Sequence, residues 1–253
     1  MFKTANLFVL ICLLAMPAAQ AAKLTPQTTA MRVPTAPPGD SKSASILVIE
    51  NREEVLEGDK RESYEGVSRE LYGIPLPRVT NDETTMAAYL GQRLKIGFDR
   101  AGYNATFVDS PKASKVEDRI DALEVGANTL IFVVDMRDWH YDFGGFKPSF
   151  LYDVTVYVYG DEKQLLAKKD FSGTELMPKG GWKHFKVRYA ELYQTIFDRI
   201  FDTSEIKQAL DGKASTTRGT IEQRLTQLQN LLDQGLIDQA AYDREKARII
   251  SEI

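Results

Sequence analysis

The sequence predicts an α+β fold over residues 45–210, a mixed sheet of about five strands with helices on one face. Apolar runs typical of strands alternate with helical patterns in the first half of this region. Three strands then follow one another, and an amphipathic helix closes the region. The expected order is therefore β-α-β-α-β-β-β-α, followed by a C-terminal two-helix hairpin over residues 220–253.

The first half of the domain contains two expected strand–helix units. Residues 45–50 form a short apolar run suited to a buried strand. A capping box at Thr80 and Glu83 precedes a helix whose apolar residues recur every four positions, until Gly102 ends it. The second unit comprises a strand and a helix at residues 103–108 and 116–125.

The second half is expected to be a meander of three strands followed by a helix. Residues 129–137 begin apolar on both faces and then turn polar, as a strand leaving a core does. Residues 149–159 alternate apolar and polar, which is typical of a half-buried antiparallel strand. Residues 165–174 complete the meander, and residues 187–201 form the helix with the broadest apolar face of the domain.

The N-terminus has the features of a cleaved export signal, residues 1–21. A short apolar core precedes Ala19-Gln20-Ala21, which matches the small-residue cleavage pattern. Because that core is shorter than the ~20 residues of a transmembrane helix, we expect a soluble periplasmic protein. Cys12, the one cysteine, follows Ile11 instead of the small residue that lipidation requires, so neither a lipid anchor nor a disulfide is expected.

Composition indicates two segments outside the folded domain and excludes two classes of partner. Residues 22–44 are rich in Pro, Ser and Thr and are expected to form a disordered or extended leader. Residues 211–219 are polar and are expected to be a flexible linker. The 32 basic and 36 acidic side chains give a formal net charge of -4, with no basic patch for nucleic acid and no charged block for an anionic membrane.

The C-terminal segment has the pattern of two short helices that are too small to fold alone. Thr220 and Gln223 have capping-box spacing, Gly235 suits the end of the first helix, and Asp238 suits the N-cap of the second. The expected interaction surface comprises Leu225, Leu228, Leu231, Leu232, Leu236, Ile237, Tyr242, Ile249 and Ile250. The segment has no Cys or His to bind metal, so we expect self-association; the alternative is packing against its own domain.

This segment resembles a SHOCT module, a short domain found at the C-terminus of many bacterial proteins. The similarity rests on the run Arg224-Leu225-x-x-Leu228-x-x-Leu231-Leu232-x-x-Gly235-Leu236-Ile237, then Tyr242-Asp243-x-x-Lys246 and Ile249-Ile250. Ala240-Ala241 stand where the family usually has an acidic residue before the aromatic. The resemblance implies a role in oligomerisation.

Residues 45–210 resemble the YajG-like family of bacterial envelope lipoproteins. The similar stretches are Leu94-x-x-Gly97-Phe98-x-x-x-Gly102-Tyr103, Leu151-Tyr152-Asp153-Val154-Thr155-Val156, Lys168-Lys169-Asp170-Phe171-Ser172-Gly173 and Asp202-Thr203-Ser204-Glu205-Ile206. The chain departs from the family in lacking a lipobox cysteine. The resemblance implies periplasmic residence and a binding or accessory role, and it supplies no catalytic residues.

One polar cluster offers a candidate for chemistry, at the end of the strand that leaves the core. It comprises Asp135, Arg137, Asp138, Trp139, His140, Tyr141 and Asp142. In a regular strand Asp138, His140 and Asp142 share one face, where they could hold a cation or exchange protons. The favoured interpretation is a solvated hairpin end with an aromatic plug, because no second His and no metal motif accompany the cluster.

Two long loops are further candidates. Residues 51–80 are expected to be a loop, and loops of that length in a compact domain are often functional. Residues 178–185 combine glycines and lysines with Trp182 and His184, a composition that could bind an anion or a sugar ring. The favoured interpretation of the second loop is that Trp182 packs against the domain.

The sequence therefore predicts a non-catalytic periplasmic binding or assembly protein whose hairpin mediates self-association. No nucleophile motif, cofactor motif or metal-ligand pattern is present, so neither an enzyme nor a cofactor is expected. One alternative is an accessory subunit of an envelope or outer-membrane assembly or transport system that docks to a different protein through the hairpin. Another is an enzyme or metal site around Asp138 and His140.

Overall fold

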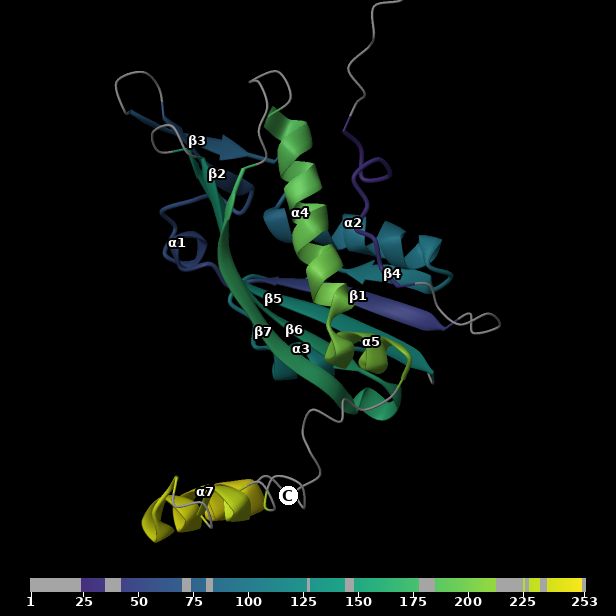
Figure 1. Cartoon of the computed structure of the whole chain (residues 1–253). Coiled ribbons are helices and arrows are strands. Elements are labelled where there is room, and N and C mark those ends of the chain that lie inside the picture. The colour runs from purple at the N-terminus through teal and green to yellow at the C-terminus, as the bar shows by residue number, and fades with distance from the viewer. Residues whose placement is uncertain are drawn as a thin grey trace, which may run out of the picture.

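The computed structural model describes residues 24–34, 42–69, 74–80, 84–126, 128–143, 148–177, 185–212, 225, 228–232 and 236–251. The strands are β1 (Ser43–Glu50), β2 (Tyr64–Arg69), β3 (Pro75–Val79), β4 (Asn104–Val108), β5 (Thr129–Phe143), β6 (Ser149–Tyr159) and β7 (Leu165–Leu176). The helices are α1 (Glu53–Leu56), α2 (Met86–Arg100), α3 (Val116–Ala122), a 3₁₀ turn at Asp161–Lys163, α4 (Phe185–Asp202), α5 (Ser204–Leu210) and α7 (Gln239–Ser251). Figure 1 shows their arrangement.

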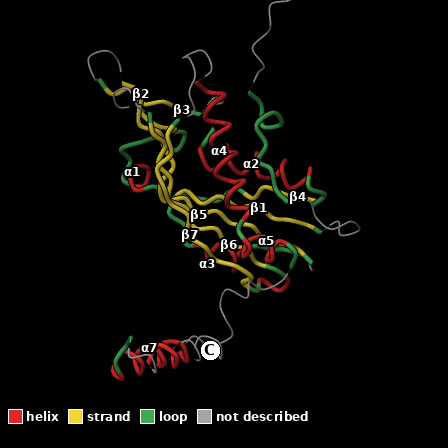
Figure 2. The backbone as a smooth tube through the Cα atoms, in the orientation of Figure 1, coloured by secondary structure: helices red, strands yellow, loops and turns green. Residues whose placement is uncertain are grey.

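A mixed seven-stranded sheet forms the centre of the protein. One path through it has the order β3-β2-β5-β1-β4, and β6 lies between β5 and β7. The long β5 is shared by two groups of strands, because its first half pairs in parallel with β1 and its last residues pair in parallel with β2. β6 runs antiparallel to β5 along nearly its whole length, and the sheet curls along this hairpin (Figure 2). The predicted α+β class is confirmed.

The main hydrophobic core lies between one face of the sheet and helices α2, α4 and α5 (Figure 1). β1 contributes Ile46 and Val48 to this core. The Phe98 ring of α2 lies 5.3 Å from the Phe132 ring of β5, between centroids, and a ring from α4 completes the contact. The expected alternation of β6 is confirmed, since its apolar face is buried in this core.

The second face of the sheet is covered in part by α3, where the sequence predicted helices on one face only. Val116 and Ile120 of α3 pack against Leu47 and Ile49 of β1. Tyr157 of β6 belongs to the same cluster. β1 alternates between two cores and is apolar on both sides, so a helix on only one face would leave half of its side chains in water.

Residues 51–80 are not one long loop, as the sequence predicted. They contain α1 and the antiparallel pair β2–β3. β3 carries Pro75 and Pro77 and lies at the edge of the sheet, where a missing N–H leaves no gap in the ladder. These prolines obscured the strand pattern in the sequence. β2 is held through its pairing with the end of β5, which is a long-range contact.

The start of α2 also differs from the predicted capping box. Thr85 is the N-cap, and its side chain accepts a hydrogen bond from the Ala88 N–H. Thr80 instead donates its hydroxyl to the Thr84 carbonyl at 2.6 Å, and Glu83 lies outside the described residues. The N-cap therefore lies five residues after the predicted one.

The expectation of an extended leader over residues 22–44 is wrong for residues 24–34, which pack against α2. The Met31 side chain is buried in the main core, and its N–H donates to the Arg93 carbonyl at 3.2 Å. The buried Arg93 guanidinium donates to the Thr29 hydroxyl at 2.6 Å. Gly97 has no side chain, which lets the Met31 carbonyl lie directly against α2. The few apolar residues in this Pro- and Thr-rich run gave too weak a signal for the contact.

Several predicted segments lie outside the described residues. They include the export signal, the linker after Gly212 and the first capping box of the hairpin. Within the part of the chain that the structure describes, no helix is long and apolar enough to cross a membrane.

Candidate functional site

A β-bulge in β5 arranges the polar cluster that the sequence indicated. Met136 pairs with Val154 and Asp138 pairs with Asp153, so Arg137 is an extra residue in the strand. The alternation of side chains shifts at this point. Before the bulge, even-numbered residues of β5 face the main core, and after it odd-numbered residues do. Arg137 and Asp138 are therefore both on the outer face, together with His140.

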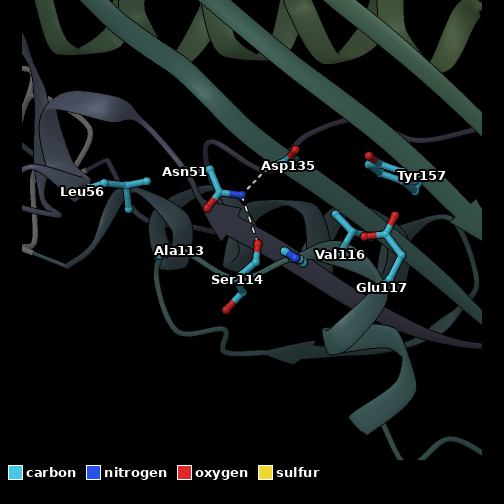
Figure 3. A pocket seen from close by; sticks show the side chains of 9 residues that line it. Asn51, Leu56, Ala113, Ser114, Val116, Glu117, Asp135 and Tyr157 are labelled. Atoms are coloured by element: carbon cyan, nitrogen blue, oxygen red, sulfur yellow. Dashed lines mark hydrogen bonds between the residues drawn. The ribbon is translucent and has the colours of Figure 1, made fainter.

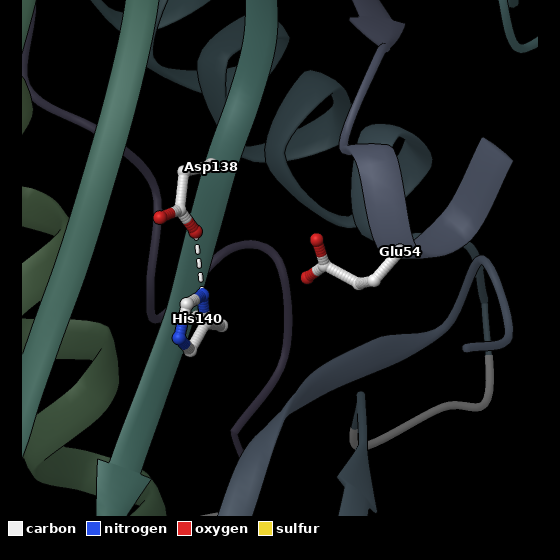
Figure 4. Close-up of side chains that lie close together, drawn as sticks. All are labelled: Glu54, Asp138 and His140. Carbon is white, nitrogen blue, oxygen red and sulfur yellow. Dashed lines mark hydrogen bonds and ion pairs between the residues drawn. The ribbon is translucent and has the colours of Figure 1, made fainter. Parts of the chain in front are cut away.

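Two carboxylates and an imidazole meet on this outer face (Figure 4). The Asp138 carboxylate lies 2.5 Å from His140 Nδ1, so the expectation that these two residues share a face of the strand is confirmed. Glu54 of α1 points toward this pair, and one oxygen or nitrogen atom from each of the three residues lies within 4.8 Å of the others. Asp142, also predicted on this face, instead pairs with Arg69 at 3.2 Å.

Burial and the neighbouring carboxylates shift the pKa of His140 in opposite directions. Burial alone would lower the pKa of His140, but the hydrogen bond and charge of Asp138, helped by the charge of Glu54, raise the pKa above its ordinary value of 6.5. The imidazolium form is thus favoured by the two carboxylates. Among the described residues, His140 hydrogen-bonds a carboxylate and no hydroxyl that could act as a nucleophile.

The aromatic residues of the same strand are part of the core. Trp139 is fully buried, and its ring lies 5.1 Å from the Phe150 ring and 5.2 Å from the Tyr193 ring. Tyr141 stacks on Tyr189 of α4 at 4.2 Å between ring centroids. These contacts agree with the predicted aromatic plug. They fix the backbone of β5 on both sides of His140.

Sequence reasoning missed a fully buried ion pair that fastens the site to the sheet. The Arg52 guanidinium binds both oxygens of Glu50, at 2.8 and 2.7 Å. It also donates to the carbonyl oxygens of Tyr64 at 2.7 Å, Trp139 at 3.2 Å and Glu62 at 3.3 Å. A signal existed, because Glu50 ends an apolar strand and Arg52 lies two residues after it. Only the long-range partners identify them as buried.

A second polar network surrounds Arg137. Its guanidinium binds both oxygens of Asp153, at 2.6 and 3.2 Å, and lies 3.6 Å from Asp135 and 3.5 Å from Asp170. The Thr155 hydroxyl donates a short hydrogen bond to Asp170. This bond lowers the pKa of Asp170, and the charge of Arg137 acts in the same direction. One arginine thus links three carboxylates across β5, β6 and β7.

Beside this network lies an open cavity of about 340 Å³ (Figure 3). The Asn51 amide donates to the Asp135 carboxylate at 2.7 Å and to the Ser114 carbonyl at 3.1 Å. The other residues that line the cavity include Glu117 and Tyr157. The described walls of the cavity combine polar groups with apolar surface.

The predicted interaction residues of the hairpin differ in their exposure to solvent. Leu228 and Ile249 are buried, at 8% and 4% exposure, whereas Leu231 and Leu236 are 39% and 67% exposed. The half-buried members are Leu225, Leu232, Ile237 and Tyr242, and the side chain of Ile250 lies outside the described residues. Asp238 is the N-cap of α7, as predicted, because its carboxylate accepts from the Ala241 N–H at 2.7 Å.

Residues 178–184 of the second candidate loop, including Trp182 and His184, lie outside the described residues. Its last residue, Phe185, begins α4 and packs edge-on against Tyr189, with ring centroids 4.6 Å apart.

No family model matches the chain, and no curated protein matches it. A DUF330 protein from Xanthomonas campestris is 11% identical, covering 72% of this chain and 93% of that one, with a TM-score of 0.40. A lipoprotein from Neisseria meningitidis is 10% identical, covering 62% and 99%, with a TM-score of 0.30. A hypothetical protein from Chlamydia trachomatis is 13% identical, covering 69% and 98%, with a TM-score of 0.34. These sequence identities and TM-scores are too low to transfer a function from those proteins to this chain. The resemblances to YajG-like proteins and SHOCT modules therefore stay predictions.

Proposed function

We propose that the chain is a non-catalytic periplasmic binding or assembly protein whose C-terminal hairpin mediates self-association. The observation that carries the proposal is the exposure of Leu231 and Leu236 on a hairpin that already buries Leu228 and Ile249. Apolar surface left on so small a unit is stabilised by burial against a second surface. A second copy of the hairpin offers that surface, because each copy presents the same leucines.

The other parts of the proposal draw on the sequence and on the sheet domain. The export signal supports periplasmic residence. The polar networks of the domain support a non-catalytic role, because Arg52 and Arg137 are engaged by carboxylates within the fold. The resemblance of the hairpin to a SHOCT module supports oligomerisation.

Light scattering on the chain from Ala22 to Ile253, compared with the same chain ending at residue 216, tests the proposal. We expect an oligomer whose mass falls toward that of the monomer on dilution, and a monomer at all concentrations after truncation. If both proteins are monomeric across the micromolar range, self-association is overturned.

Leu231→Glu combined with Leu236→Glu tests the exposed leucines without touching the buried ones. Burying one leucine contributes roughly 2 kcal/mol, so we expect association to weaken by about 100-fold or more. The matched control is Ala240→Glu with Ala247→Glu, which adds the same charge at exposed positions of α7. Equal weakening in both pairs would show a charge effect and would count against a leucine contact.

The same leucines could dock on a different envelope protein, and crosslinking in cells separates the two cases. A photoreactive residue at position 236 is expected to give adducts of twice the monomer mass. Adducts of another mass, in a chain that is monomeric alone, would favour the accessory-subunit alternative.

A further inference from the structure

We infer that Glu54, Asp138 and His140 bind a divalent transition-metal cation on the outer face of the sheet (Figure 4). The three side chains come from two elements, α1 and β5, that are far apart in the sequence. All three are half-buried, which leaves the site reachable from solvent. This inference does not depend on the hairpin and goes beyond the proposed function.

The charges at this position call for a cation. Among the residues that the structure describes, none forms an ion pair or a side-chain hydrogen bond with the Glu54 carboxylate, which lies close to the like-charged Asp138. The nearby Arg52 does not supply the missing charge, because its guanidinium is bound bidentately by Glu50 and that pair is neutral. The His140 imidazolium balances only one of the two carboxylates. Once it gives up its Nδ1 proton, the three ligands carry two negative charges, which a divalent cation balances.

The surrounding structure holds the ligands in place before any cation binds. Arg52 donates to the carbonyl oxygen of Trp139, the residue between Asp138 and His140, and so ties the chain leading into α1 to β5. The Tyr64 ring stacks on the imidazole at 6.4 Å between centroids, with an interplanar angle of 30°. Groups of this kind orient metal ligands and raise affinity. The flexible Glu54 side chain can bring its carboxylate closer to Asp138 and His140 when a cation binds.

The ligand types define the class of cation. One imidazole nitrogen with two carboxylate oxygens suits Zn²⁺ or Mn²⁺, with water in the remaining positions. The cation takes the place of the proton between Asp138 and His140 Nδ1, and that proton leaves to solvent. A site with three protein ligands and free coordination positions can also accept a ligand atom from a bound molecule.

The test is a calorimetric titration of the metal-free mature chain with Zn²⁺. We expect one cation per chain, and a loss of affinity of at least 10-fold in Glu54→Gln, Asp138→Asn and His140→Ala. Glu54→Gln is the most informative variant, because it removes one proposed ligand and leaves the Asp138–His140 hydrogen bond intact. Two controls should bind as the unaltered chain does. Asp142→Asn removes a nearby carboxylate that is already paired with Arg69, and His184→Ala removes the other histidine.

A spectroscopic measurement guards against variants that fold poorly. Co²⁺ bound through one nitrogen and two oxygens gives visible absorption bands that report on its ligands, and these bands should change in His140→Ala. Affinity unchanged by Glu54→Gln, or stoichiometric binding that survives loss of all three ligands, would overturn the site and indicate an adventitious ion only. The absence of stoichiometric binding by the unaltered chain would overturn it equally.

Discussion

Gly97 of α2 lies so close to Met31 that a Cβ at position 97 would stand 1.8 Å from the Met31 carbonyl oxygen. The contact joins residues 24–34 to the middle of a core helix. It explains a glycine inside a helix, where glycine costs roughly 1 kcal/mol relative to alanine. Residues 24–34 are therefore part of the folded domain and not a tether in front of it.

Gly97→Ala is expected to destabilise the domain, because the added methyl group must displace the backbone at Met31. Overpacking of this kind costs about 1–3 kcal/mol, more than the gain in helix propensity. Urea unfolding measures the change, and limited proteolysis should cut earlier within residues 24–34. Gly126→Ala is the control, since its Cβ would meet only the Thr129 hydroxyl at 3.8 Å. Equal stability of the two variants would contradict the contact.

Arg52→Met is expected to cost about 3–5 kcal/mol of unfolding free energy, because it leaves the Glu50 carboxylate buried without a partner. The exposed fractions of the paired side chains are 0% and 2%. Arg69→Met removes an exposed pair with Asp142 and should cost less than about 1 kcal/mol. Urea unfolding of both variants measures the difference. A small effect at Arg52 would show that water reaches Glu50.

Thr155→Val is expected to raise the pKa of Asp170 toward its ordinary value of 3.8, because the lowered pKa arises first from the Thr155 hydrogen bond. A carboxyl group with a lowered folded pKa stabilises the fold above its unfolded pKa, and this contribution is lost as the pH falls through the folded pKa. The stability difference between the unaltered chain and the variant should therefore shrink in acid. Carboxyl NMR titration reads the pKa directly.

Thr195→Val is the control for this titration, since its hydroxyl bonds a helix carbonyl and no carboxylate. An Asp170 pKa that is the same in all three proteins would assign the shift to Arg137 alone.

Asp238→Ala is expected to weaken α7 by about 1 kcal/mol through loss of its N-cap, while the sheet domain unfolds at an unchanged temperature. If the hairpin mediates self-association, the oligomer should weaken in parallel. Circular dichroism follows helix content, and light scattering follows mass. Asp243→Ala is the control, since among the described residues its carboxylate accepts one exposed hydrogen bond, from Gln239. A loss of stability in the sheet domain would show that the hairpin packs against it.

Local pattern predicted much of the fold. The alternation in β6, the apolar face of α4 and the N-cap at Asp238 each arise from neighbours within a few residues, which the sequence displays directly. That Asp138 and His140 share a strand face followed from a period of two. These features needed no knowledge of distant contacts.

Features built from distant contacts were missed or misplaced. The β2–β3 hairpin depends on the last residues of β5, and Met31 depends on the space beside Gly97. Glu54 joined the candidate site only because Arg52 ties the chain before α1 to the carbonyl oxygen of Trp139. In each of these contacts the two partners belong to segments that are far apart in the sequence.

The sequence by itself determined the α+β class and the strands and helices whose apolar patterns repeat locally. Tertiary structure alone decided which charged residues are buried, which face α3 covers and that Glu54 lies near His140. The physical reason is that burial and ion pairing depend on distances between segments far apart in the chain. Hydrophobic periodicity records only which side of its own element a residue occupies.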